Sequence, residues 1–152
     1  MAIIYIIHLL STFFSFAIAL FLQTLHFPLL RFIGPYQYPV YYEKQKMKLT
    51  LLTFPVYSME VFSAIFLMIR FFTVGGEMTE AKQNSFFVYL STIILLLLIH
   101  LVTFYFIKPL LKKLLKTWDD KTLNELKLWN LSRVSFWFLR LVILIILVIN
   151  PA

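Results

Sequence analysis

The sequence predicts an all-α integral membrane protein, a four-helix up-down bundle with both termini outside the cytoplasm. Hydrophobic residues make up 61% of the 152 residues and charged residues only 14%, whereas soluble domains contain about 45–50% and about 25%, respectively. Four apolar stretches are long enough to span a bilayer core, which requires roughly 20 residues per helix. Lysine and arginine are concentrated in two of the three connections. Together these features exclude a soluble enzyme, a disordered tail and a nucleic-acid-binding module.

Residues 1–152 are expected to form a single transmembrane domain. The predicted membrane spans cover residues 3–33, 48–74, 85–107 and 123–149. The first connection, 34–47, is rich in proline and tyrosine, the second, 73–84, contains two glycines, and the third, 108–122, is rich in lysine. Short connections between antiparallel neighbours favour an up-down bundle.

Local signals predict where these helices begin and bend. Thr122 and Glu125 fit a capping box that starts the fourth helix. Pro55 is expected to kink the second helix, and Pro109 to bend the exit of the third, because proline removes a helical hydrogen bond. The lysine-rich segment 110–118 has leucines at helical spacing, so it either extends the third helix past the membrane or lies on the inner membrane surface.

The distribution of basic residues predicts the orientation. The basic residues in or beside the first and third connections are Arg31, Lys44, Lys46, Lys48, Lys108, Lys112, Lys113, Lys116 and Lys121. The second connection has only Lys82, beside two glutamates. Because basic loops remain inside, we expect a multi-pass protein of the bacterial cytoplasmic (inner) membrane, embedded in the lipid bilayer and without a cleaved signal peptide. The net charge of +7 comes from these basic connections, where it orients the chain in the bilayer. We therefore expect no nucleic-acid partner.

Ionisable residues inside the spans are the candidates for function, since each charge at mid-bilayer costs about 2.5–3.5 kcal/mol. Helix-rise arithmetic places several of them at comparable depths in the inner half of the bundle. In the fourth helix, four residues at 3-4-3 spacing form one stripe that must face protein. The predicted buried polar cluster contains Glu60, His100, Asn130, Arg133, Trp137 and Arg140, with Gln23 and His26 as secondary candidates.

Glu60 and Arg140 are predicted to pair, because they lie at nearly the same estimated depth and Glu60 is the only carboxylate there. Three interpretations of the cluster remain open: an ion pair that fixes helix register, a ligand or proton site, or arginines that reach the lipid surface. Phe136 and Phe138 are expected to be more exposed than the stripe. His8 and Arg70 lie near the outer surface and are interpreted as interfacial anchors.

The residues limit the cofactor chemistry. The chain has no cysteine, and one membrane-embedded carboxylate is too few for a di-metal site, so no metal site is predicted. A haem would have to use His26 and His100 as its axial ligands. No phosphate-binding, dinucleotide-binding, serine-hydrolase or zinc-protease motif is present.

The order of these motifs resembles a family of small four-span bacterial membrane proteins of unassigned function. His26-Phe27-Pro28-Leu29 is similar to that family's motif at the end of its first helix, and Pro55 with Glu60 resembles its Pro and Glu pair. The fourth helix resembles an Asn-x-x-Arg-x-x-x-Trp-x-x-Arg signature at Asn130, Arg133, Trp137 and Arg140. Leu111 stands where the family carries a histidine. More distantly, the layout is similar to anthrone-oxygenase-like membrane proteins.

Three classes of function follow. The chain is expected to be a binding protein or an accessory subunit of a membrane assembly, with membrane protein subunits or a second copy of itself as partners. The alternative is a membrane enzyme for a lipophilic aromatic or quinone-like substrate, so catalysis is left open. The third class is a small transporter or proton path that uses Glu60 and His100 as a relay.

Overall fold

The part of the protein that the computed structural model describes, residues 2–73 and 80–149, is helical apart from the connection 115–119; residues 2 and 80–85 are described without their side chains. No strand occurs in these ranges. The elements are α1 (Ala2–Phe21), the π-turn η1 (Leu22–His26), α2 (Phe27–Thr73), α3 (Glu80–Val102), the π-turn η2 (Thr103–Ile107), α4 (Lys108–Leu114) and α5 (Asp120–Ile149). In these ranges, the helical runs long and apolar enough to cross a membrane are Ile3–Thr73, Phe86–Leu114 and Asp120–Ile149.

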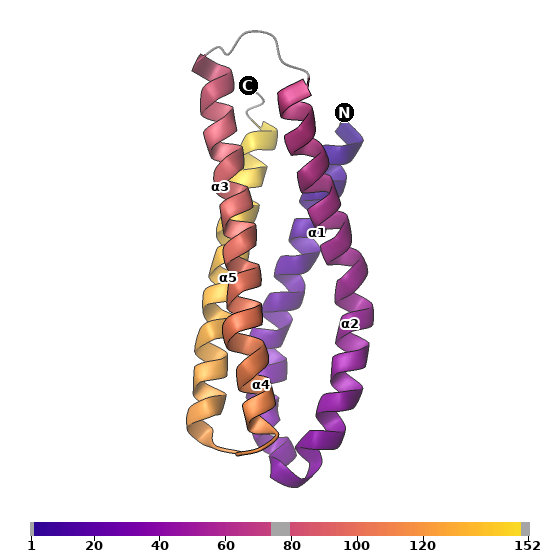
Figure 1. Cartoon of the computed structure of the whole chain (residues 1–152), viewed down its shortest axis with the longest axis vertical. Coiled ribbons are helices and arrows are strands. Elements are labelled where there is room, and N and C mark those ends of the chain that lie inside the picture. The colour runs from indigo at the N-terminus through magenta and orange to yellow at the C-terminus, as the bar shows by residue number, and fades with distance from the viewer. Residues whose placement is uncertain (1, 74–79, 150–152) are drawn as a thin grey trace.

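The first of these runs is folded back on itself at Gly34. Gly34 has φ 71° and ψ 173°, a backbone conformation that is essentially restricted to glycine. The segments before and after it lie side by side along the long axis of the molecule (Figure 1). The sequence predicted two spans here separated by a loop at 34–47. That loop is wrong, because residues 35–73 are helical. Pro35 has the fixed φ that suits a first helical position, so the turn needs no further residues.

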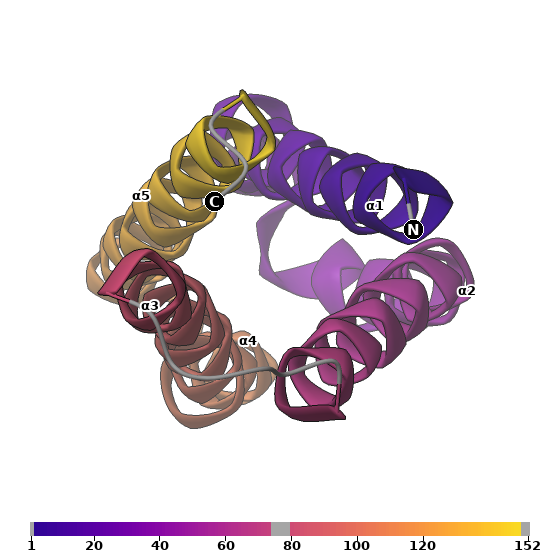
Figure 2. The ribbon, with the colours of Figure 1, turned by 90° about the horizontal axis from the view of Figure 1, so that it is seen from above.

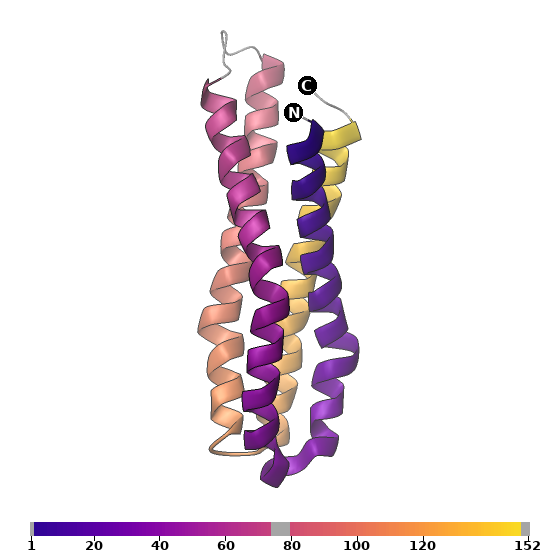
Figure 3. The ribbon, with the colours of Figure 1, turned by 90° about the vertical axis from the view of Figure 1, so that its right-hand side faces the viewer.

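Two prolines explain where the π-turns lie. Pro28 follows η1 and Pro109 follows η2, each by two residues. In a regular α-helix the proline ring would clash with the carbonyl four residues earlier. Here the residue before each proline instead donates to a carbonyl five residues back, Phe27 to Leu22 and Lys108 to Thr103. The predicted bend before Pro109 is thus a π-turn, and α4 extends the line of α3 rather than turning onto a membrane surface (Figure 3).

Asp119 caps the start of α5. One carboxylate oxygen accepts from the Thr122 backbone N–H at 2.6 Å, and the other accepts from the Thr122 hydroxyl at 2.7 Å. The predicted capping box at Thr122 and Glu125 is therefore wrong, because Thr122 lies inside the first turn and the helix begins at Asp120. These bonds from Thr122, backbone first, hold the pKa of Asp119 below its usual range.

The helices pack in a ring rather than in layers. α1 packs against both α2 and α5, and α3 packs against α5, as the view along the bundle shows (Figure 2). α3 reaches α2 through side chains, including the Tyr89 hydroxyl, which donates to the Ala64 carbonyl at 2.8 Å. Large apolar side chains such as Phe32, Leu51 and Phe62 are exposed on the outside, where a bilayer would cover them.

Candidate functional site

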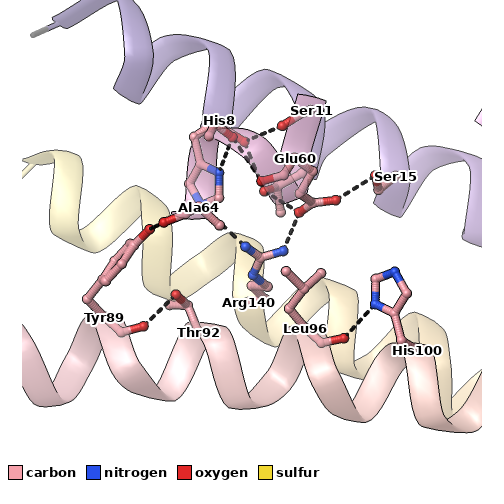
Figure 4. Close-up of polar contacts among 12 residues, drawn as sticks. His8, Ser11, Ser15, Glu60, Ala64, Tyr89, Thr92, Leu96, His100 and Arg140 are labelled. Atoms are coloured by element: carbon pink, nitrogen blue, oxygen red, sulfur yellow. Dashed lines mark hydrogen bonds and ion pairs between the residues drawn. The ribbon is translucent and has the colours of Figure 1, made fainter. Parts of the chain in front are cut away.

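Glu60 and Arg140 form a buried ion pair in the middle of the bundle, as their depths predicted. Glu60 comes from α2 and Arg140 from α5, and both side chains are essentially inaccessible. One terminal nitrogen of the Arg140 guanidinium donates to Oε1 of Glu60. Figure 4 shows the guanidinium lying between this carboxylate and His8.

α1 supplies further hydrogen bonds to the Glu60 carboxylate. The Thr12 hydroxyl donates to Oε1 at 2.8 Å, and the Ser15 hydroxyl donates to Oε2 at 2.9 Å. Glu60 therefore accepts bonds from α1 and α5 while belonging to α2. Each oxygen of this buried carboxylate therefore has at least one hydrogen-bond donor.

His8 completes the group. The second terminal nitrogen of Arg140 lies 3.3 Å from Nε2 of His8, and because arginine only donates, Nε2 must be the acceptor. Nδ1 then carries the proton and donates to the Ser63 hydroxyl at 2.8 Å, and Ser63 donates to the Glu60 carbonyl at 3.0 Å. We call the residues His8, Thr12, Ser15, Glu60, Ser63 and Arg140 the Glu60 centre.

The interpretation of His8 as an interfacial anchor is wrong, since its side chain is buried in this centre. The error came from taking residues 34–47 as a loop, which made Glu60 seem closer to the inner surface than it is and so placed it at a different depth from His8. Measured from the turn at Gly34, His8 and Glu60 are each 26 residues away and therefore level. His8, Thr12 and Ser15 also follow a 4-3 helical spacing, a signal that could have identified this face of α1.

Arg133 lies in a second, separate group. One of its terminal nitrogens donates to Oδ1 of Asn130. Asn130 in turn donates to Oε1 of Gln23 at 2.8 Å and to the Ala19 carbonyl at 3.4 Å. Arg133 is only 5% exposed, its Nε has no partner, and no carboxylate in the described ranges pairs with it.

Trp137, one helical turn along α5 from Arg133, lies with its ring centroid 5.7 Å from the Arg140 guanidinium, so it adjoins both groups. Tyr57 of α2 stacks on Trp137 with ring centroids 6.1 Å apart and meets His100 edge-on at 6.2 Å. Trp137 is fully buried, yet its indole N–H has no acceptor. Tyr57 and His100 are half-buried. We call the residues Gln23, Tyr57, His100, Asn130, Arg133 and Trp137 the Arg133 centre.

The single cluster predicted from the sequence is therefore two. His100 does not reach Glu60; its Nδ1 bonds to the Leu96 carbonyl at 2.8 Å, on the opposite side of Leu96 from Arg140 (Figure 4). Asn130, Arg133, Trp137 and Arg140 are all buried, as the stripe predicted. Phe138 is exposed, and Phe136 is half-buried against the core. Tyr57 was missed because tyrosine in a membrane protein is typical of the interface.

His26 lies apart from both centres. Gln45 donates an amide N–H to its Nε2 at 2.6 Å, so its Nδ1–H faces the Tyr41 hydroxyl at 3.0 Å. Neither ring nitrogen is then free for a haem iron, so His26 does not fit the predicted pairing with His100. In the described ranges no group of three or more His, Asp or Glu side chains is placed to hold a metal ion.

The two centres differ in chemistry. In the Glu60 centre the guanidinium is paired with a carboxylate and only the Nε of Arg140 has no acceptor, whereas the Arg133 centre has two such N–H groups and no carboxylate. A small cavity of about 20 Å³ beside His8, lined mostly by apolar side chains, has room for about one water molecule. The chain matches no protein-family model, no curated protein and no solved structure. Its function is therefore inferred from the geometry of its own residues.

Proposed function

We propose that this protein crosses the bacterial cytoplasmic membrane four times, with both termini outside, and binds a lipophilic ligand at the Arg133 centre. The fold at Gly34 supports four crossings, because it divides Ile3–Thr73 into two segments that each exceed the roughly 20 residues a span requires. The turns at Gly34 and between α4 and α5 lie at the same end of the molecule (Figure 1). Basic residues flank both turns, which supports a cytoplasmic position for that end.

The observation that carries the binding function is the charge on Arg133. This guanidinium is buried within the bundle, it makes one hydrogen bond to a neutral amide, and Glu60 is already paired with Arg140. A buried charge without a partner costs several kcal/mol. A ligand that brings an acceptor to Arg133 removes that cost, so the arginine is a binding group that its own chain leaves unsatisfied.

The Glu60 centre has a structural role in this proposal. Its carboxylate, imidazole and guanidinium are bonded mainly to one another and to hydroxyls of α1 and α2. Such a network joins three helices at one level and fixes their register. We therefore place ligand binding at Arg133 and not at Glu60.

Mass spectrometry of the protein purified from its native membrane in mild detergent tests the proposal. We expect a bound lipophilic molecule in the parent protein and in Lys127→Gln, which removes a positive charge from the same helix, one turn before Asn130, at a side chain that belongs to neither centre. We expect that molecule to be lost from Arg133→Gln. A folded Arg133→Gln protein with the same ligand at the same occupancy would contradict the proposal, as would a parent protein that carries only stoichiometric protein subunits.

A further inference from the structure

We propose that the ligand of the Arg133 centre is a lipophilic monocarboxylate, an apolar body that carries one carboxylate group. This inference rests on the proposed binding function and names the chemistry of the ligand. It follows from the hydrogen-bonding groups, the charge and the depth of the centre.

The unused groups of the centre are donors. The Nε of Arg133 and the indole N–H of Trp137 are buried without acceptors, and neither group can accept a hydrogen bond. They lie one helical turn apart on the same face of α5. The ligand must therefore present acceptor oxygens, and a planar carboxylate matches the fork of a guanidinium with two parallel bonds.

The charge of the centre favours a single negative charge. Arg133 is its only residue with a permanent charge, since Gln23 and Asn130 are neutral amides. A carboxylate carries one negative charge and neutralises the arginine. A phosphate monoester carries about two at neutral pH and would leave a buried negative charge, while a quinone carbonyl is neutral and would leave the arginine uncompensated.

The depth of the centre requires an apolar body. Arg133 lies 13 residues into α5, roughly 20 Å from the start of the helix, and therefore below the level of lipid headgroups. Its surroundings include the apolar cluster of Ala19, Leu96, Ile99 and Val134. The partly exposed members of the centre are Gln23, Tyr57 and His100, on η1, α2 and α3, and these are the members that an apolar body entering from the membrane would meet first.

A binding assay with delipidated full-length protein tests the carboxylate directly. Purified protein in detergent is immobilised and titrated with tritiated oleate in a scintillation-proximity assay, with unlabelled oleate, methyl oleate, decylubiquinone and dodecyl phosphate as competitors. We expect saturable oleate binding, and competition by the other three compounds at least tenfold weaker than that of oleate. Arg133→Gln should lower oleate affinity at least tenfold, Arg133→Lys should restore part of it, and Lys127→Gln should leave it unchanged.

The outcomes separate this inference from the proposed function. Equal competition by methyl oleate, or stronger competition by decylubiquinone or dodecyl phosphate that depends on Arg133, overturns the carboxylate and leaves the binding function standing. Absence of any Arg133-dependent binding, together with a native protein free of ligand, overturns both. If Arg133→Gln does not fold, the competitor series on the parent protein decides the head group. Trp137→Phe, which removes the indole N–H alone, should then weaken oleate binding several-fold, and unchanged affinity would contradict the site.

Discussion

Arg133 and Arg140 show how differently one residue type behaves on one face of one helix. They are seven residues apart on α5, and both side chains are buried. Arg140 bonds to Glu60 and His8, whereas Arg133 bonds only to the Asn130 amide. The same substitution should therefore have opposite consequences at the two positions.

Replacement of Arg140 should strongly destabilise the protein. Arg140→Met leaves the Glu60 carboxylate buried without its cation, a change that costs about 3–5 kcal/mol in comparable buried pairs. The double variant Glu60→Gln with Arg140→Met should recover much of the loss, because no charge is then stranded. Unfolding in mixed detergent micelles, followed by circular dichroism, measures the free energies. A double variant as unstable as Arg140→Met would show that the ion pair is not what the arginine supports.

Replacement of Arg133 should be tolerated by the ligand-free protein. Arg133→Met removes an uncompensated buried charge and keeps the apolar stem, so the free energy of unfolding should be unchanged or higher. Delipidated protein is the correct sample, because bound ligand would stabilise the parent alone. Destabilisation as large as that of Arg140→Met would mean that Arg133 is already satisfied by its own chain.

For individual residues, the sequence predicted the Glu60–Arg140 pair and the burial of the polar stripe on α5. It could do so because charges must avoid lipid and because helix rise converts residue number into depth. It could not separate two centres, because depth along a helix says nothing about which neighbouring side chain fills the space. Leu96 lies between His100 and Arg140 (Figure 4), and Tyr57 packs against His100, and both positions depend on packing.

Among the helices, α5 has a first turn that is capped by a charged side chain, the carboxylate of Asp119. The pKa of Asp119 is held below its usual range by bonds from Thr122. A carboxylate with a depressed pKa stabilises the fold above its unfolded pKa, and this stabilisation is lost as pH falls through the folded pKa. The start of α5 should therefore loosen in acid.

Hydrogen exchange of the first-turn amides of α5 tests this cap. At neutral pH, Asp119→Ala should exchange these amides faster than the parent, because the Thr122 N–H loses its acceptor. Asp119→Asn keeps an acceptor oxygen and should lie between them. In acid, below the folded pKa of Asp119, the parent should approach the alanine variant, and a difference that persists there would contradict the charge-dependent part of the cap.

The elements themselves were predictable wherever apolar residues dominate, and least predictable at 34–47. Proline and tyrosine in that segment indicated a loop, yet α2 continues through Pro39 and Tyr38 is buried. Tyr38 donates to the Leu111 carbonyl at 3.2 Å and packs on Trp118. Tertiary contacts with the α4 end of the bundle therefore outweigh the local preference of the sequence.

For the molecule as a whole, the described ends of α1 and α5 lie at the same end, opposite the Gly34 turn (Figures 1 and 3). An alkaline phosphatase fusion after Ala152 should therefore be active, because we place that end outside the cytoplasm. Green fluorescent protein at the same position should be dark, and the same protein inserted between Leu115 and Trp118 should fluoresce. The reverse pattern of reporter activity would show that the termini are cytoplasmic, and it would not change the proposed number of membrane crossings.

The π-turn η1 sets the rotational phase of everything before it. A π-turn holds one residue more than the α-helical geometry around it needs, so it absorbs that residue without rotating the segments on either side. If the same residues were wound as a regular α-helix, which Pro28 opposes, the extra residue would instead rotate α1 by about 100° about its axis. His8, Thr12 and Ser15 would then turn away from Glu60, so the proline that distorts this helix locally keeps a network many residues away in register.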